Sequence, residues 1–155
     1  MAVIGADSAA RPDALRHASE VGRELGAHGA VLVCGGLGGV MEAACRGAHE
    51  MGGTTIGILP GTDRAAANEF VDVAIPTGVG EARNALVVCA ADAVIALAGE
   101  FGTLSEIALA LKAGKPVVGI ATWELGRDGE PVDAIERAGD PAEAVDRALA
   151  LARDA

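Results

Sequence analysis

Two hydrophobic patterns alternate along most of the chain. Short, continuous apolar runs are typical of strands buried on both faces of a sheet, and they cover residues 2–5, 30–34, 54–59, 71–75, 93–97 and 116–120. Small apolar residues recurring every three or four positions indicate helices over residues 12–25, 40–48, 80–90, 103–113 and 141–152. This alternation predicts an α/β fold of three layers, with helices on both faces of a mostly parallel sheet.

One domain accounts for the whole length. A chain of 155 residues has the size of an ordinary domain, and neither a shift in composition nor an internal repeat divides it. The most polar stretch, residues 124–139, is predicted to be an excursion on the surface. We therefore expect residues 1–155 to form a single domain.

Glycine is abundant: there are 22, about twice the usual share of roughly 7 %. Three glycine-containing turns, at residues 5–8, 35–39 and 99–102, lie between a predicted strand and a predicted helix. Ligands bind at this edge of parallel sheets, because glycine permits close approach and the free N–H groups of helix starts favour anions. The expected phosphate-binding rim comprises Gly5, Ser8, Gly35, Gly36, Gly38, Gly39, Gly99, Gly102 and Thr103. A second group of glycines is interpreted as helix punctuation, that is, as residues at which helices end: Gly26, Gly29, Gly52 and Gly53.

The charge balance argues against nucleic acids as partners. Twelve Lys and Arg stand against 22 Asp and Glu, and the net charge of −10 repels a phosphate backbone. Two Phe, one Trp and no Tyr leave little for a base to stack on, so we expect a ligand to be held by its phosphate and ribose. Neither a membrane-spanning run nor a secretory leader is visible, which predicts a cytoplasmic protein without membrane partners.

The cysteines and histidines show no metal-binding pattern. Cys34, Cys45 and Cys89 lie far apart without a CxxC pair, so we interpret them as reduced thiols of the core. The three histidines stand apart on predicted helix surfaces and lack the spacing of metal ligands. No metal site is expected.

Two common phosphate motifs are absent. A Walker loop requires Gly-Lys-Ser/Thr at a helix start, whereas Gly114-Lys115 is followed by a proline at a predicted strand start. A dinucleotide fingerprint requires an acidic residue near the end of the second strand, which here ends at Cys34-Gly35. The sequence therefore disfavours an ATPase and an NAD enzyme.

The turns at residues 35–43 and 98–106 resemble those of a known family. Residues 98–106 read AGEFGTLSE and align with the PGGxGTxxE signature of the LONELY GUY (LOG) family, and Arg83-Asn84 falls at the family's upstream Arg-Lys pair. The chain is similar, from Val3 to about Ile120, to a sub-branch of short bacterial proteins related to the molybdenum-cofactor carrier protein of algae. The resemblance implies a Rossmann-like nucleotide-binding domain that forms a homodimer or a higher homo-oligomer.

The resemblance also implies two candidate functions. The first is binding of a nucleotide or a phosphate-bearing cofactor, such as molybdopterin, at the glycine-rich rim. The alternative is the LOG-type reaction, in which a phosphoribohydrolase cleaves a purine nucleoside 5′-monophosphate to base and ribose 5-phosphate, with Arg83 and Glu106 as catalytic residues. Ala98, Glu100 and Asn84 replace a proline, a glycine and a lysine of the family pattern, and the last two favour binding.

Each candidate side chain also has a purely structural interpretation. The guanidinium of Arg83 could clamp a phosphate or form a surface ion pair. Asn84 could donate to a ligand or cap its helix, and Ser8 has the same two options. Glu106 could act on the ribose or form a capping box with Thr103 as the N-cap.

Overall fold

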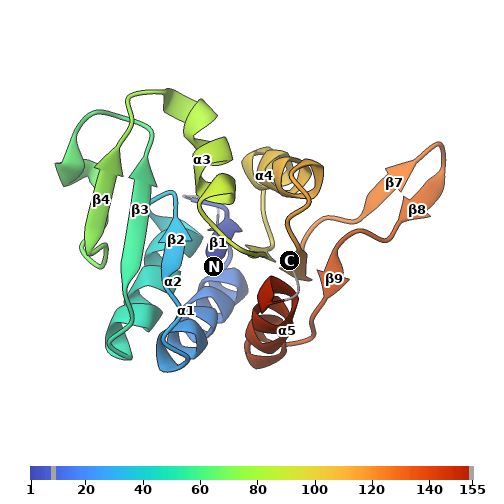
Figure 1. Cartoon of the computed structure of the whole chain (residues 1–155), viewed down its shortest axis with the longest axis horizontal. Helices are drawn as coiled ribbons and strands as arrows, with labels where there is room; N and C mark the ends of the chain where they lie inside the picture. Colours follow the sequence, from blue (N-terminus) through green and yellow to red (C-terminus); the bar gives the residue numbers. More distant parts are fainter. Residues whose placement is uncertain (8–9, 154–155) are drawn as a thin grey trace.

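The computed structural model describes residues 1–7 and 10–153, which form a three-layer α/β fold around a parallel sheet (Figure 1). The sheet has seven strands in the order β4-β3-β2-β1-β5-β6-β9, and every neighbouring pair is parallel. Its strands are β1 (Ala2–Gly5), β2 (Leu32–Cys34), β3 (Thr55–Leu59), β4 (Val73–Pro76), β5 (Val94–Leu97), β6 (Val117–Ile120) and β9 (Glu136–Arg137). The predicted fold class is confirmed, and all six predicted strands are present with small shifts at their ends.

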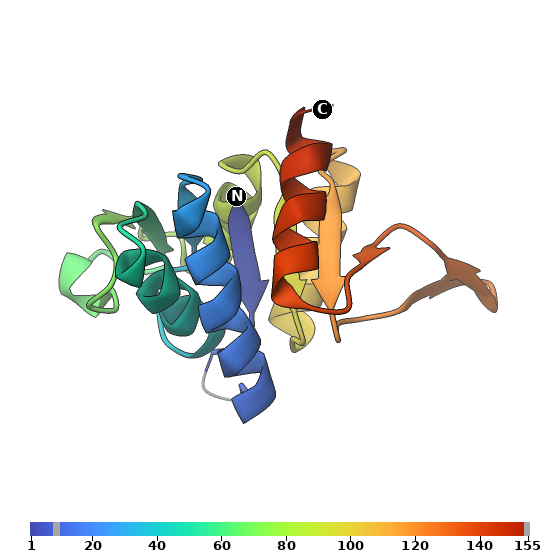
Figure 2. The same ribbon diagram turned by 90° about the horizontal axis from the view of Figure 1, so that it is seen from below.

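Helices pack on both faces of the sheet, and each face has its own apolar core. One face is covered by α1 (Pro12–Ala27), α2 (Gly39–Glu50) and α5 (Pro141–Arg153), which stand in front of the sheet in Figure 2. The other face is covered by α3 (Arg83–Cys89) and α4 (Phe101–Lys112). Successive side chains of a strand point to opposite faces, so Val3 belongs to the first core and Ile4 to the second.

The order of the strands reverses at β1. The chain builds β2, β3 and β4 outward on one side of β1 and then returns to place β5 on its other side. Ala2 accordingly pairs with Val33 of β2 and with Val94 of β5. The crevice outside the carboxyl ends of strands at such a reversal is where open α/β sheets bind ligands. Two 3₁₀ turns, η1 (Arg64–Ala66) and η2 (Gly80–Ala82), complete the connections on the β3–β4 side.

The polar excursion at residues 124–139 has more structure than predicted. It contains an antiparallel hairpin of β7 (Leu125–Arg127) and β8 (Glu130–Val132), which projects from the body of the molecule (Figure 1). Asp128 and Gly129 form its turn with φ of 56° and 86°, as a tight hairpin requires. The chain then adds β9 to the sheet edge beside β6. Sequence reasoning missed β9 because its two residues are charged and carry no apolar run.

Glycines also let α1 and α2 pack closely. A Cβ on Gly22 would lie 2.0 Å from the carbonyl oxygen of Ala44, and one on Gly47 would lie 2.0 Å from that of Ser19. Gly26 and Gly53 belong to the same contact, because a Cβ on Gly53 would lie 2.8 Å from the Cα of Gly26. The interpretation as helix punctuation is wrong for Gly26, which lies inside α1, whereas Gly29 and Gly52 follow the ends of α1 and α2 with φ of 67° and 72°.

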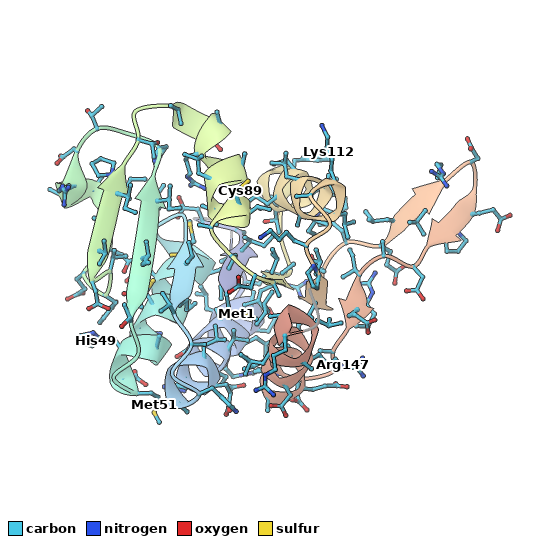
Figure 3. The ribbon with its side chains drawn as sticks, viewed as in Figure 1. Met1, His49, Met51, Cys89, Lys112 and Arg147 are labelled. Atoms are coloured by element: carbon cyan, nitrogen blue, oxygen red, sulfur yellow. The ribbon has the colours of Figure 1, made fainter. Side chains whose placement is uncertain are left out.

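The cysteines divide into two environments. Cys34 and Cys45 are buried with their Sγ atoms 3.5 Å apart, whereas Cys89 is exposed on α3 (Figure 3). The prediction of core thiols is thus confirmed for two cysteines and wrong for Cys89. Among the described residues, no helix is long and apolar enough to cross a membrane.

Candidate functional site

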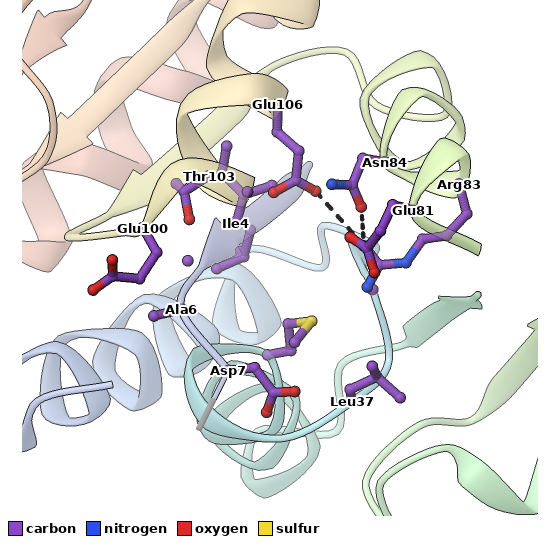
Figure 4. Close-up of a pocket in the computed structure, with 15 residues that line it drawn as sticks. Ile4, Ala6, Asp7, Leu37, Glu81, Arg83, Asn84, Glu100, Thr103 and Glu106 are labelled. Atoms are coloured by element: carbon purple, nitrogen blue, oxygen red, sulfur yellow. Dashed lines mark hydrogen bonds and ion pairs between the residues drawn. The ribbon is translucent and has the colours of Figure 1, made fainter. Parts of the chain in front are cut away.

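A cavity of ≈ 290 Å³ opens at the carboxyl ends of the strands, beside the reversal at β1 (Figure 4). The end of β1, the turn after β2, the start of α3 and the first turns of α4 contribute its walls. We call it the Arg83 cavity. Seven of the predicted site residues line it: Gly5, Gly35, Arg83, Asn84, Gly102, Thr103 and Glu106.

The remaining predicted residues lie elsewhere. A Cβ on Gly36 would meet the side chain of Leu59 at 2.8 Å, and Cβ atoms on Gly38 and Gly39 would meet Asp7 at 2.9 and 2.0 Å. These three glycines accommodate protein atoms, so their contact with a ligand stays a prediction. Gly99 lines a second cavity described below. Ser8 falls outside the described residues.

Arg83 is the central cation of the Arg83 cavity. It is the first residue of α3, and only 6 % of it is exposed. Its Nη1 donates to Asn84 Oδ1 and lies 3.9 Å from Glu106 Oε1, while its buried Nε has no partner among the described residues. A Cβ on Gly35 would come within 2.7 Å of the guanidinium, so the guanidinium occupies the space that this glycine leaves free. The alternative of a surface ion pair is wrong, because burial places Arg83 inside the molecule.

Glu106 faces Arg83 from the second turn of α4 (Figure 4). Burial raises the pKa of its carboxyl to about 7, although the positive charge of Arg83 opposes the shift, and Glu81 adds to it. A carboxyl that changes protonation near neutral pH can bind a ligand hydroxyl as donor or acceptor and can transfer a proton. A strongly shifted group beside a buried arginine in a cleft is typical of functional sites.

The structure rules out the capping roles that were the structural interpretations of Glu106 and Asn84. Helix α4 begins at Phe101 with Glu100 as its N-cap, so Thr103 is the third helical residue and cannot be the cap of a capping box with Glu106. Asn84 does not cap α3, whose N-cap is Ala82; its amide oxygen accepts from Arg83 instead. Both side chains are buried at the cavity wall.

Three helices begin at this edge of the sheet without a side-chain cap. The N-caps of α1, α2 and α4 are Arg11, Gly38 and Glu100, and among the described residues no side chain caps any of them. The first-turn N–H groups of a helix have no intrahelical partner and carry a partial positive charge. In Figure 4 the carboxylate of Glu100 points away from the Arg83–Glu106 pair. The start of α4 therefore presents free donors to the cavity that Arg83 also lines, as an anion site requires.

A second cavity of ≈ 350 Å³ continues from the first and shares Ala6 and Glu100 with it. We call it the Trp123 cavity, because the half-buried Trp123 forms part of its wall. Phe101 lies next to Trp123, and the centroids of the two rings are 5.5 Å apart. Sequence reasoning missed this pair, although both residues flank strand ends: Phe101 follows β5 and Trp123 follows β6.

Comparisons with known proteins agree with this architecture. The model of the SLOG cluster4 family matches residues 1–145. The molybdenum cofactor binding protein of the phototrophic bacterium Rippkaea orientalis is 35 % identical, with a TM-score of 0.87 over 97 % of this chain and 94 % of that one. The Moco carrier protein of Chlamydomonas reinhardtii is 35 % identical, with a TM-score of 0.86 over 99 % and 97 %.

A third similar protein is an enzyme. The cytokinin riboside 5′-monophosphate phosphoribohydrolase of Mycobacterium tuberculosis is 34 % identical over 133 residues, which are 79 % of this chain and 71 % of that one. These matches confirm the Rossmann-like fold and the LOG-like resemblance. Among residues 1–7 and 10–153, no group of three or more His, Cys, Asp or Glu side chains is arranged to hold a metal ion.

Proposed function

The chain belongs to the SLOG cluster4 family, and from this premise we propose that it binds a small phosphorylated ligand, a nucleotide or a molybdopterin-type cofactor, at the Arg83 cavity. The observation that carries the proposal is the buried guanidinium of Arg83, which is held over Gly35 with its Nε unpartnered among the described residues. Burial of a permanent charge is costly unless an anion compensates it, and Glu106, the carboxyl 3.9 Å from Arg83, has a raised pKa. Asp7, Glu81 and Glu100 also line the cavity, so the phosphate would have to bind on the guanidinium side, away from these carboxylates.

The arrangement suits a phosphate with an attached hydroxylated group. The planar guanidinium fits two phosphate oxygens, and the first-turn N–H groups of α4 supply further donors. Glu106 is placed to bind a ribose or other hydroxyl next to the phosphate. The printed names of two similar structures, as carrier and binding proteins of the molybdenum cofactor, support a ligand of this chemistry.

Thermal unfolding with and without ligand tests the proposal. Addition of AMP or ribose 5-phosphate should raise Tm, because a ligand that binds only the folded state stabilises it by mass action. Arg83→Met should abolish that rise. Arg23→Met is the matched control, because Arg23 is an exposed arginine of α1 that pairs with Glu50 at 2.6 Å. If AMP, ribose 5-phosphate and a molybdopterin-type cofactor all leave Tm unchanged, the proposal is wrong.

One observation favours the enzymatic alternative. Glu106, with its pKa raised to about 7 and its carboxylate 3.9 Å from Arg83, has the properties of an acid–base group for cleavage of an N-glycosidic bond. In that reaction water would replace the base at the anomeric carbon, and the base would leave with a proton. We infer that a phosphoribohydrolase would use Arg83 to hold the phosphate and Glu106 to assist the cleavage.

Chromatography of products separates binding from hydrolysis. Incubation of the pure protein with AMP should yield adenine and ribose 5-phosphate if the chain is a hydrolase, and Glu106→Gln should remove that yield. A rise in Tm with AMP and no release of adenine would mean that the protein binds AMP without hydrolysing it. Release of adenine that persists in Glu106→Gln would come from a contaminating enzyme. Arg23→Met is the control that should retain the yield, because Arg23 is exposed and pairs with Glu50.

We further propose a homodimer or a higher homo-oligomer in the cytoplasm. In the described part of the chain, β4 pairs only with β3 and leaves its outer edge open, with Val73 and Ile75 exposed on it. Exposed apolar edge strands are prone to pair with a second chain. Light scattering after size-exclusion chromatography would measure the mass, and a mass near the chain's 15.3 kDa would contradict the proposal.

A further inference from the structure

We propose that the Trp123 cavity binds a fused two-ring nitrogen heterocycle, which stacks on Trp123, the aromatic residue of its wall, with Phe101 packed against the Trp123 ring. The inference rests on the proposed function, because the heterocycle would belong to the ligand whose phosphate lies in the Arg83 cavity. Purines and pterins share the flat, polar, fused ring that such a pair recognises. The sequence alone predicted little aromatic surface for a base, and the fold brings together two of the three aromatic residues.

The exposure of Phe101 is the first observation. It is the most exposed large hydrophobic side chain among the described residues, at 77 %, and it is the first residue of α4. Its ring lies 5.5 Å from that of Trp123 with a tilt of 39°, so the two rings contact each other. A single exposed phenylalanine carries no functional meaning, whereas one that packs against the aromatic residue of a cavity wall extends the apolar surface beside that cavity.

The walls of the Trp123 cavity are made of small residues in unusual conformations. Ala98 and Ala121 directly follow β5 and β6, and both have positive φ, at 47° and 48°. Alanine rarely adopts this region, and such residues cluster at ligand sites. Both alanines line the cavity together with Gly99, Ala6 and Ala10. Small side chains leave the width that a flat ring needs.

Hydrogen bonds fix the position of the Trp123 ring. Trp123 Nε1 donates to the carbonyl of Glu100 at 3.3 Å, which ties the ring to the N-cap of α4. Arg137 Nη2 of β9 donates to the carbonyl of Trp123 at 2.8 Å. Thr122 Oγ1 donates to the carbonyl of Ala98 and links the two strand ends. A platform held on several elements is preorganised, which lowers the entropic cost of binding a ring.

The two cavities meet at the start of α4. Ala6 and Glu100 line both, and Gly102 and Thr103 of the first turn of α4 line the Arg83 cavity, while Gly99 lines the Trp123 cavity. A ligand with its phosphate on the first-turn N–H groups of α4 would lie next to Phe101, the first residue of that helix, and the ring of Phe101 contacts that of Trp123. Arg11 and Glu100, which have opposite charges, are the ionic groups of the Trp123 cavity wall and can bond the polar edge of a heterocycle.

Trp123 makes the inference directly measurable, because it is the sole tryptophan and the chain has no tyrosine. We expect AMP to quench Trp123 fluorescence and to bind about tenfold more tightly than ribose 5-phosphate, by calorimetry. Phe101→Leu should lower AMP affinity severalfold and leave ribose 5-phosphate unaffected. Trp123→Leu should remove most of the preference for AMP, and Trp123→Phe should retain it. Phe70→Leu is the matched control, because Phe70 lies away from both cavities.

The outcomes separate the two proposals. Equal affinity for AMP and ribose 5-phosphate, or an AMP affinity unchanged in both Phe101→Leu and Trp123→Leu, would overturn the heterocycle site and leave phosphate binding intact. Quenching by 6-hydroxymethylpterin or adenine without any binding of ribose 5-phosphate or AMP would support the heterocycle site and refute the phosphate site. Tighter binding of the pterin than of adenine would identify the ring. Absence of binding by all four compounds would refute both proposals.

Discussion

The glycine turns after β2 and after β5 both join a buried strand to a helix at the same edge of the sheet, but they differ in how much of their surroundings the protein fills. In the turn at residues 35–39, Cβ positions on Gly35, Gly36 and Gly39 are filled by the guanidinium of Arg83, the side chain of Leu59 and the backbone of Asp7. In the turn at residues 98–102, a Cβ on Gly99 would meet the side chain of Thr103 at 2.5 Å, whereas a Cβ on Gly102 would meet nothing within 4 Å. The first turn is packed by the protein, and the second is open at Gly102, where α4 begins.

Hydrogen bonding is similar at the two turns, so the contrast is one of space. Asn68 fixes the turn after β2 by donating from its side chain to the carbonyl of Leu37 at 2.9 Å and from its backbone to that of Gly36 at 2.9 Å. Thr122 and Trp123 fix the turn after β5 by donating to the carbonyls of Ala98 and Glu100. The comparison teaches that a glycine-rich turn can admit a ligand only where the protein itself leaves the space unused.

Gly39→Ala should have the largest effect on stability. Its Cβ would lie 2.0 Å from the carbonyl oxygen of Asp7, and its φ of +61° is unfavourable for alanine. We expect a loss of about 3 kcal/mol in the free energy of unfolding, measured by urea denaturation. A loss below ~1 kcal/mol would contradict the description of this turn as packed.

The pH dependence of stability should report the burial of Glu106. Its folded-state pKa is raised from 4.5 to about 7, so between these values the folded state binds more protons than the unfolded state. The stabilisation by protonated Glu106 is fully present below pH 4.5 and is lost as the pH rises through 7, at an expected cost of roughly 3 kcal/mol in the free energy of unfolding. Urea titrations from pH 4.5 to 8 measure it, and Glu106→Gln should flatten this part of the profile. An unchanged profile in that variant would show that another group titrates.

Gly35→Ala should weaken phosphate binding through Arg83. The new Cβ would lie 2.7 Å from the guanidinium and would displace it, since a flexible side chain can move where a backbone cannot. We expect about a tenfold loss of ribose 5-phosphate affinity, equivalent to ~1.4 kcal/mol, with a smaller loss of stability than in Gly39→Ala. Calorimetry measures the ribose 5-phosphate affinity of both variants, and urea denaturation measures their stability. Undiminished affinity would mean that the position of Arg83 is not needed.

Gly102→Ala should have the smallest effect on stability. Nothing lies within 4 Å of its Cβ position, and alanine is the better helix former, so the free energy of unfolding should change by less than about 1 kcal/mol. Because Gly102 lines the Arg83 cavity, the added methyl should lower ribose 5-phosphate affinity about threefold. A destabilised protein with normal affinity would reverse the assignment of packed and open turns.

Much of the fold follows from local pattern. The buried strands carry continuous apolar runs and the helices carry periodic small residues, so both could be placed along the chain. The two charged residues of β9 carry no such signal, because their strand depends on the neighbouring β6 for its hydrogen bonds. The start of α4 was expected two residues too late, because Phe101 and Gly102 are poor local markers of a helix.

The site was predictable in part. Arg83, Glu106 and the turn at residues 99–102 were identified from motif position, and the fold brings them to one edge of the sheet. The aromatic pair was not, because Phe101 and Trp123 are separated in sequence and follow different strands. Neither residue type nor spacing indicates that two strand ends will adjoin.

The amino-acid sequence by itself determined the α/β architecture, the single sheet and the edge at which its glycine turns gather. These follow from periodicity and from the backbone freedom of glycine, which are properties of short segments. Only the tertiary structure decided which glycines make room for protein and which leave open space. It also decided that Arg83 is buried, that the pKa of Glu106 is raised and that Trp123 meets Phe101, because burial and proximity depend on atoms from segments distant in the chain.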